Sequence, residues 1–286
     1  MTDPGDDLEL TKTSRKAWGA LETVHVLAHF APPVTQAYVD LGFRPRLSYF
    51  AARSAPYGAV GPEVPAATFY AFAPWLFTKT LPSSWEIASP EQVVEAQRDS
   101  IAGVMAQVLA EIDDAHVTEL LGLLRTVCAG LTAPGRPLYA AYAGLPWPED
   151  QGAALWHAAT LIREHRGDGH LALLVAAELD PVEAVVLNGL YAGTMEFMRA
   201  TRGWTDEEYA AGAERLAARG LVADGGLTED GLAFRKQLER ETDRLALAGW
   251  RHLGLDGTRR VLELALPVRD GALAGGMLPE WMSGGR

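Results

Sequence analysis

The feature that most constrains the fold lies between residues 203 and 248, where helix and turn signals follow one another in a fixed order. Thr205 is an N-cap with Glu208 three residues later, a capping box that starts a helix. The sequence DGG at 224–226 is typical of the tight turn of a β-hairpin, and Thr228 is placed to cap a long helix. This order predicts a compact unit of a helix, two very short strands and a long final helix.

Further helices precede this unit. Asp180 and Pro181 start one that reaches about Tyr191, and another is expected over 170–178. The resulting order of three helices, a two-stranded wing and a long helix is that of a winged helix-turn-helix. The stretch RLAARGLVADGGLTEDGLAFRKQLE, within 170–248, resembles the same part of MarR-type regulators. The resemblance implies the fold and leaves the function open, because many enzymes use this unit to dimerise.

The charge of the chain disfavours nucleic acid as a partner. Its net charge is -12 and its pI is about 5.0, and an acidic surface repels a phosphate backbone. Residues 170–248 hold 8 basic and 14 acidic residues, a net of -6. The expected recognition helix begins with acidic residues at 206–208, and the wing also carries acids. DNA binding stays open as an alternative through a small patch of arginines: Arg199, Arg202, Arg215 and Arg219.

The remaining composition points to a cytoplasmic protein without a membrane partner. The single cysteine, Cys128, excludes an intramolecular disulfide and is expected to be a buried thiol. The N-terminus is acidic and lacks the apolar region of a secretory signal. No apolar stretch approaches the length of a membrane span.

The predicted fold class is all-α with a small two-stranded β-wing, in which a helical N-terminal region packs on a winged helix-turn-helix. Residues 1–12 are expected to be disordered. Residues 13–148 form a helical domain with an aromatic, Gly- and Pro-rich segment at 43–90, residues 149–276 form the winged-helix domain with flanking helices, and 277–286 form a tail. We expect a homodimer through the final long helix.

Four segments carry a second resemblance. They are ARSAPYGAVGPEV at 52–64, TFYAFAP at 68–74, LPWPED at 145–150 and HAATLIREHRGDGH at 157–170. Together they are similar to a family of actinobacterial helix-turn-helix-containing proteins of unknown function, over most of the chain from Trp18 to Pro279. The resemblance implies a helical region followed by a winged helix, and it implies no particular substrate.

The end of the last segment is open to two interpretations. In the structural one, a helix over 151–166 ends at Gly167, Asp168 caps the next helix, and the neighbouring arginines complement the helix dipole. In the functional one, imidazoles, guanidiniums and a carboxylate crowd the same turn and bind an anionic small molecule or perform acid–base chemistry. The side chains concerned are Arg163, His165, Arg166, Asp168 and His170, with His157 on the face of the same helix that carries Glu164.

Two earlier pairs are further candidates. His25 and His29 are four residues apart on a helix, the spacing of two imidazole ligands of one metal, but two core or cavity-wall histidines are the commoner outcome. Arg53 and Glu63 flank a Gly/Pro-rich segment, either as an ion pair that holds this loop, which we favour, or as anchors in an aromatic pocket.

The function predicted from these residues is binding of a small molecule by a winged-helix protein, either as a plain binder or as an enzyme. No metal site and no cofactor is assigned. The predicted site lies between the two domains and consists of His25, Arg53, Glu63, His157, Arg163, His165, Arg166, Asp168 and His170. The alternatives are a ligand-responsive, MarR-like DNA-binding regulator and a scaffold protein without a ligand.

Overall fold

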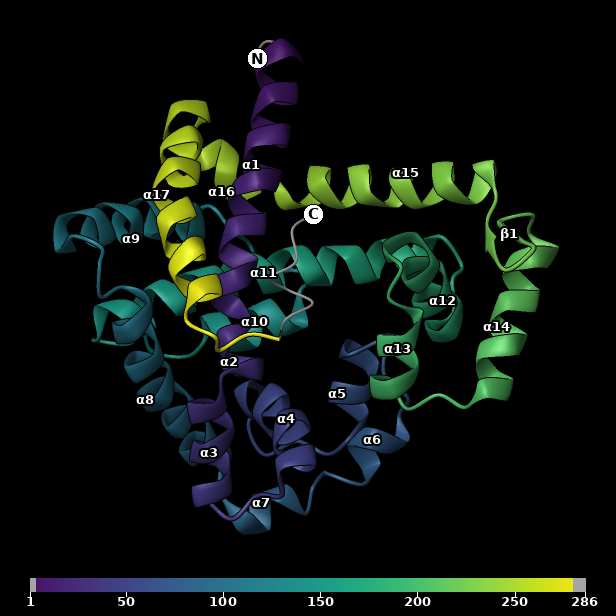
Figure 1. Cartoon of the computed structure of the whole chain (residues 1–286), viewed down its shortest axis with the longest axis horizontal. Helices are drawn as coiled ribbons and strands as arrows, with labels where there is room; N and C mark the ends of the chain where they lie inside the picture. Colours follow the sequence, from purple (N-terminus) through teal and green to yellow (C-terminus); the bar gives the residue numbers. More distant parts are fainter. Residues whose placement is uncertain (1–3, 280–286) are drawn as a thin grey trace.

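The computed structural model describes residues 4–279 and is built almost entirely of α-helices (Figure 1). Within that range the one sheet is a two-stranded antiparallel hairpin, in which Val222 pairs with Leu227 and Ala223 with Gly226. The predicted mainly helical fold with a small two-stranded hairpin is confirmed.

The elements are as follows. The first part of the chain forms α1 (Pro4–His25), α2 (Leu27–Phe30), α3 (Pro32–Asp40), α4 (Pro45–Ser54), the 3-10 helix η1 (Ala55–Tyr57), α5 (Glu63–Thr68), α6 (Trp75–Thr78), α7 (Ser84–Ile87), α8 (Pro90–Val108), α9 (Asp114–Ala129) and α10 (Pro137–Ala143). The second part forms α11 (Gln151–Ala176), α12 (Pro181–Ala192), α13 (Met195–Thr201), α14 (Asp206–Ala218), β1 (Val222–Ala223), β2 (Gly226–Leu227), α15 (Glu229–Ala246), α16 (Ala248–Leu253) and α17 (Leu255–Ala274).

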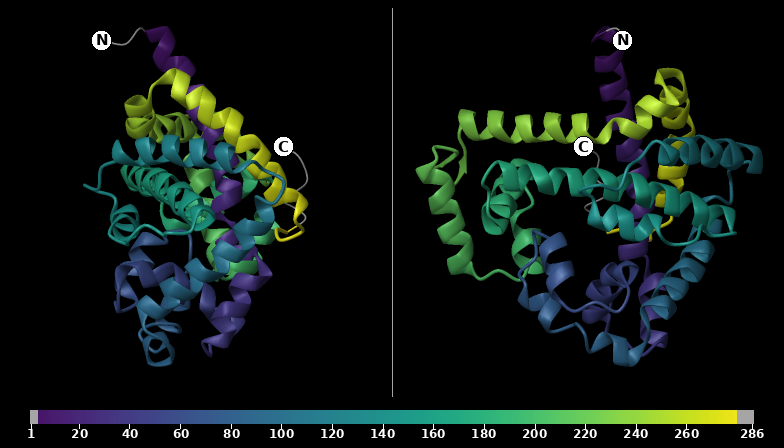
Figure 2. Two further views of the ribbon diagram at one scale, coloured as in Figure 1. Left: turned by 90° about the vertical axis from the view of Figure 1, so that its left-hand side faces the viewer. Right: turned by 180° about the vertical axis from the view of Figure 1, so that it is seen from behind.

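Apolar side chains gather in two cores. The larger core joins α1–α10 and the first half of α11 to α16 and α17, which return from the end of the chain to pack on α1 and α9. The smaller core lies between the end of α11, α12, α14, the hairpin and α15. Figure 2 shows from behind how α11 and α15 run side by side and connect these regions. Because α11 contributes to both cores, the two cores do not coincide with the two predicted domains. The domain boundary at residue 148 remains a prediction.

The first helix begins earlier than the sequence indicated. Residues 4–12, expected to be disordered, are the first turns of α1, and residues 1–3 lie outside the described range. Two of the charges that suggested disorder pair with the C-terminal helices: Asp7 with Arg251 at 2.9 Å, and Glu9 with Arg259 at 2.5 Å. Leu10 is buried. Of the expected tail, the described part includes the buried Leu278.

We name residues 179–246, which include α12–α15 and the β1–β2 hairpin, the hairpin unit. The caps at the start of α14 and α15 form as predicted. Thr205 and Glu208 make the capping box of α14, and the Thr228 side chain accepts a hydrogen bond from the Gly231 N–H at the start of α15. A Cβ on Gly231 would lie 2.0 Å from the carbonyl oxygen of Leu221. The glycine of the Leu-Thr-x-x-Gly run is therefore required because α15 packs directly on the backbone that enters the hairpin.

The aromatic segment between α5 and α6 packs on the hairpin unit. The Tyr70 hydroxyl donates to the Leu179 carbonyl at 2.5 Å, and the Trp204 indole donates to the Ala71 carbonyl at 3.0 Å. The Trp75 indole donates to the Gly203 carbonyl at 2.7 Å. A segment too apolar to be a free linker is thus used to join the two cores.

Candidate ligand-binding site

The helix α11 continues through the turn that the sequence predicted at its signature. Gly167 was expected to end a helix, but it lies inside α11 and does not have a positive φ. Asp168 does not cap a following helix; its Oδ2 accepts a hydrogen bond from the Tyr139 N–H at 2.9 Å, at the start of α10. Packing of α11 on α1, α9 and α15 along its length outweighs the local stop signal.

Gly167→Ala is expected to stabilise the protein by about 0.5–1 kcal/mol, because alanine loses less backbone entropy in a helix and its Cβ would meet other atoms only at 3.5 Å or more. Gly169→Ala is the matched comparison, since its Cβ would lie 2.7 Å from the Arg136 guanidinium, and we expect no gain there. Urea unfolding of both variants measures the difference. If Gly167→Ala destabilises the protein instead, Gly167 would be the left-handed end of a helix, as the sequence predicted.

A continuous helix distributes the predicted side chains over several faces. His165 packs edge to face on Tyr139, with ring centroids 5.2 Å apart, and burial together with Arg136 lowers its pKa to about 3. Burial raises the pKa of Asp168 to about 6. Both side chains face α10 and therefore hold this short helix against α11.

The centre of the candidate site is a buried carboxylate between two guanidiniums. Glu164 Oε1 accepts from Arg53 Nη1 at 2.5 Å, and Oε2 accepts from Arg163 Nη1 at 2.6 Å. Burial alone would raise the pKa of Glu164, but Arg163 and Arg53 lower it to about 2. Glu22 on α1 lies 3.7 Å from Arg163 Nε. We name the set Glu22, His25, His29, Arg53, Arg163 and Glu164 the Glu164 cluster.

Both histidines of the first pair belong to this cluster and are neutral. His25 Nδ1 lies 3.0 Å from the Thr160 hydroxyl, and its Nε2 lies 3.2 Å from His29 Nε2 and 3.8 Å from Glu164. Burial lowers the pKa of both imidazoles well below the usual value, and Arg53 and Arg163 lower it further. The two rings therefore serve as hydrogen-bonding groups at neutral pH.

Water reaches one edge of the cluster. The side chains of Arg163 and Glu22 are 33% and 26% exposed, and the half-buried His29 packs on Tyr49, with ring centroids 5.5 Å apart. Tyr49 leads to Phe72, whose ring lies 4.4 Å from the Arg202 guanidinium carbon. The cluster thus continues as an aromatic and cationic surface up to α13 of the hairpin unit.

Six of the nine predicted site residues lie outside the Glu164 cluster. His165 and Asp168 face α10, Arg166 and His170 face α15, and Glu63 and His157 lie apart from both groups. Glu63 is exposed at the start of α5, and Arg53 pairs with Glu164 instead, so the proposed Arg53–Glu63 ion pair is wrong. His157 is buried against Trp147, with ring centroids 5.0 Å apart. Residues 53 and 63 were paired because they flank one loop, whereas the Arg53 side chain faces α11.

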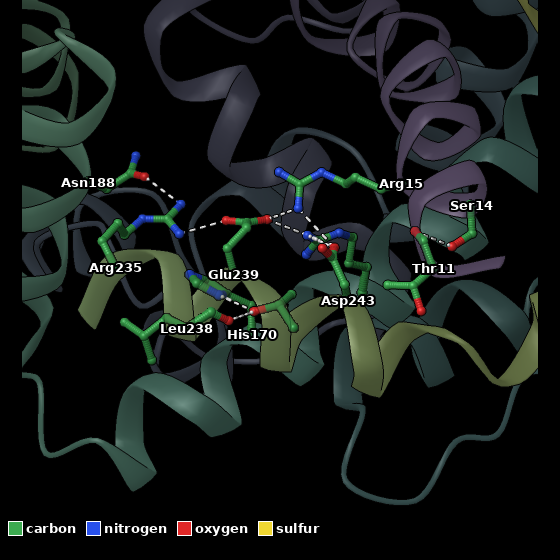
Figure 3. Close-up of polar contacts among 11 residues, drawn as sticks. Thr11, Ser14, Arg15, His170, Asn188, Arg235, Leu238, Glu239 and Asp243 are labelled. Carbon is green, nitrogen blue, oxygen red and sulfur yellow. Dashed lines mark hydrogen bonds and ion pairs between the residues drawn. The ribbon is translucent and has the colours of Figure 1, made fainter. Parts of the chain in front are cut away.

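Arg166 and His170 face α15, and Arg166 enters a second polar network there (Figure 3). His170 Nδ1 lies 2.9 Å from the Thr242 hydroxyl. Arg166 donates to Glu239 and to Asp243, the latter at 2.7 Å, and stacks over Trp18. Arg15 and Arg235 complete what we name the Glu239 network, whose members are Arg15, Arg166, Arg235, Glu239 and Asp243. The network ties α15 to α1 and α11.

Glu239→Gln is expected to lower the free energy of unfolding by about 2–3 kcal/mol, since hydrogen bonds to charged groups are each worth about 1.5–3 kcal/mol. Burial would raise the pKa of Glu239, but Arg166, Arg235 and Arg15 lower it to about 2, and the side chain is 22% exposed. Urea unfolding at pH 7 measures the loss.

Glu241→Gln, which removes an exposed partner of Arg244 on the same helix, is the control for Glu239 and should cost under about 1 kcal/mol. Equal effects of the two variants would contradict the role given to the Glu239 network.

The sequence missed several residues of these networks. Glu22 completes the first cluster, and Glu239 and Asp243 complete the second. One signal was available: Glu22, His25 and His29 follow the i, i+3, i+7 spacing of one helix face. Apart from Arg235, four residues before Glu239, the partners of the α15 acids lie far away in the chain, so the sequence did not show that these acids meet Arg15 and Arg166.

The arginines considered as a DNA-binding patch are engaged within the protein. Arg199 pairs with Asp206, and Arg215 lies 2.6 Å from Asp180. Arg219 donates to the Ala177 carbonyl at 3.0 Å. The acids at 206–208 are exposed, so the start of α14 presents negative charge.

None of the helices among residues 4–279 has the length and apolar character needed to cross a bilayer. No three His, Cys, Asp or Glu side chains that the structure describes are placed to hold a metal ion together.

Comparison with known proteins identifies the family to which the chain belongs. No curated protein and no solved structure gives a significant match to the chain. The model of a helix-turn-helix family matches residues 14–279, which include both cores and both polar networks. Because the match spans nearly the whole chain, the protein belongs to this helix-turn-helix family.

Proposed function

We propose that the protein binds a small molecule at the Glu164 cluster, beside its helix-turn-helix unit. The observation that carries the proposal is a buried polar cluster with unpartnered atoms. Arg53 Nε and Glu22 Oε2 have no hydrogen-bond partner among the described residues. Buried polar atoms normally have partners, and leaving them unpaired is unfavourable. Atoms of this kind next to an exposed edge are suited to receive a polar ligand.

The charges of the surface favour an anionic ligand. Two guanidiniums, those of Arg53 and Arg163, lie against the carboxylates of Glu164 and Glu22. A third, that of Arg202, stacks on Phe72 and Phe197 at the end of the aromatic surface, and no carboxylate whose side chain the structure describes forms an ion pair with it. Burial raises the pKa of Glu22, so this acid compensates less charge than an exposed one.

The test is a thermal-shift screen of small organic acids at pH 7, followed by calorimetry of any acid that raises the melting temperature. Arg163→Gln should abolish the shift, because it removes an exposed cation of the cluster while Arg53 still pairs with Glu164. Arg244→Gln, at an exposed position of α15, should retain it. If an acid still binds to Arg163→Gln, the ligand is recognised elsewhere on the protein. If no acid raises the melting temperature of the wild type, the proposed anion site does not exist.

A second candidate is a ligand-responsive DNA-binding regulator. Membership of a helix-turn-helix family and the hairpin between α14 and α15 favour it. The engaged arginines and the exposed acids of α14 oppose it, because affinity for DNA depends on cations that neutralise phosphates. We expect no mobility shift with DNA from the gene's own promoter at about 50 mM salt, where electrostatic affinity is strong. A sequence-dependent shift would favour the regulator.

A further inference from the structure

A groove of about 680 Å³ lies on the other side of the larger core. Its walls are one face of α8, the turn at 55–58 and the segment 145–153 that leads into α11. The face of α8 extends from Pro90 to Ala102, about 18 Å along the helix axis. The floor is largely apolar and consists of Pro56, Val94, Ala102, Leu145, Pro146 and Ala153.

Carboxylates line one edge of this groove at regular intervals. Glu91, Glu95 and Asp99 are four residues apart, all exposed, and all line the groove. Side chains at this spacing stand about 5–6 Å apart in a row. Because the three carboxylates are spread along the helix, they do not converge on one point as the ligands of a metal ion would.

The groove carries more negative than positive charge. Glu149 and Asp150 add two exposed carboxylates from the opposite wall, and Asp150 also caps α11 by accepting a hydrogen bond from the Ala153 N–H. No cation whose side chain the structure describes forms an ion pair with any of the five acids. The one basic lining residue, Arg98, is turned to the chain, where it donates to the Pro146 carbonyl.

A buried, unpartnered side chain stands behind the same wall. His157 is 1% exposed, and neither of its ring nitrogens has a hydrogen-bond partner. It lies one turn after the lining residue Ala153 on α11, hence on the same face of that helix. Its ring packs on Trp147, between the two prolines that line the groove. His157 does not itself line the groove, and burial lowers its pKa to about 4, so at neutral pH it adds no positive charge behind this wall.

We propose that this groove binds a linear aliphatic polyamine, whose ammonium groups pair with Glu91, Glu95 and Asp99 while its methylene stem covers the apolar floor. A short methylene stem separates the ammonium groups of such a molecule by a distance similar to that between the carboxylates. A divalent metal ion would interact with the carboxylates but would leave the apolar floor of the groove exposed to water. The site is distinct from the Glu164 cluster and does not depend on the function proposed for it.

The experiment is calorimetric titration of the full-length protein with spermidine in low-salt buffer at pH 7.5. We expect saturable binding with one molecule per chain. The double variant Glu95→Gln/Asp99→Asn should weaken binding about tenfold or more, since each lost ion pair contributes modestly and two add. Both positions are exposed on a helix, and circular dichroism checks that the variant is folded.

The matched control is Asp224→Asn/Glu229→Gln, which removes the same charge from exposed positions at the hairpin and the start of α15. It should bind spermidine as tightly as the wild type, within about twofold. If the two double variants bind spermidine equally weakly, the protein attracts cations only through its overall negative charge, and the proposal is overturned. Displacement by Mg²⁺ at matched ionic strength, an absence of saturation, or binding of a Lys-rich peptide without binding of spermidine would also overturn it.

Discussion

Lowering the pH from 7 to 5 is expected to reduce the free energy of unfolding by about 4 kcal/mol through two buried histidines alone. His157 and His165 are each 1% exposed. Burial, followed by the charges of nearby arginines, lowers their pKa values to about 4 and about 3, against about 6.5 in an unfolded chain. Because the folded pKa is the lower one, the stabilisation is complete above pH 6.5 and is lost as the pH falls toward 4.

Three more histidines act in the same direction. Burial, with nearby arginines, lowers the pKa of His170 to about 4 and those of His25 and His29 well below the usual value. Asp168 opposes them: its pKa is raised to about 6, so its contribution to stability decreases as the pH rises through that value. Since domains are stable by only about 5–15 kcal/mol, we expect the protein to unfold in mild acid, near pH 5.

Urea unfolding followed by circular dichroism at pH 7, 6 and 5 measures this loss. His157→Gln should reduce the slope of stability against pH by about 1.4 kcal/mol per pH unit, whatever its effect at pH 7. His252→Gln, at an exposed position, should leave the slope unchanged. Identical slopes for the wild type and His157→Gln would show that the pKa of His157 is the same in the folded and the unfolded protein.

Glu164→Gln is expected to lower the free energy of unfolding by about 3–5 kcal/mol, the usual result of removing one partner from a buried ion pair. The guanidinium of Arg53 is 5% exposed and has Glu164 as its carboxylate partner at 2.5 Å. Burial opposes its charge, and Glu164 is the main group that raises its pKa. With glutamine in place of the carboxylate, a buried charge is left uncompensated between α4 and α11.

The pair can be separated from general destabilisation by a double variant. Arg53→Met combined with Glu164→Gln removes the stranded charge, so it should be more stable than Glu164→Gln alone. Glu214→Gln, at an exposed position on α14, should change stability by less than about 0.5 kcal/mol. Additive losses in the double variant would mean that Arg53 and Glu164 do not stabilise each other.

Local signals in the sequence predicted local structure well. Asp180 caps α12, Thr205 caps α14, and Thr228 caps α15, and each side chain accepts a hydrogen bond from a backbone N–H a few residues later. The DGG turn lies between β1 and β2. These features depend on residues within about one helical turn, and such residues are visible together in a sequence.

The candidate site was predicted only in part, because its geometry depends on distant partners. The sequence singled out Arg53 and Arg163, and the structure joins them through Glu164. It paired Arg53 with Glu63 across a loop, whereas the true partner is 111 residues away. It also ended a helix at Gly167, although packing on several other helices carries α11 through that residue.

The position of α11 in both cores has a consequence for how the protein folds and unfolds. The larger core needs α16 and α17 from the far end of the chain, so a fragment ending at residue 148 would lack one wall, and the remaining fragment would expose the apolar faces of two orphaned helices. Neither piece is therefore expected to fold by itself. We therefore expect the ends of the chain and its middle to become structured together, in one cooperative step.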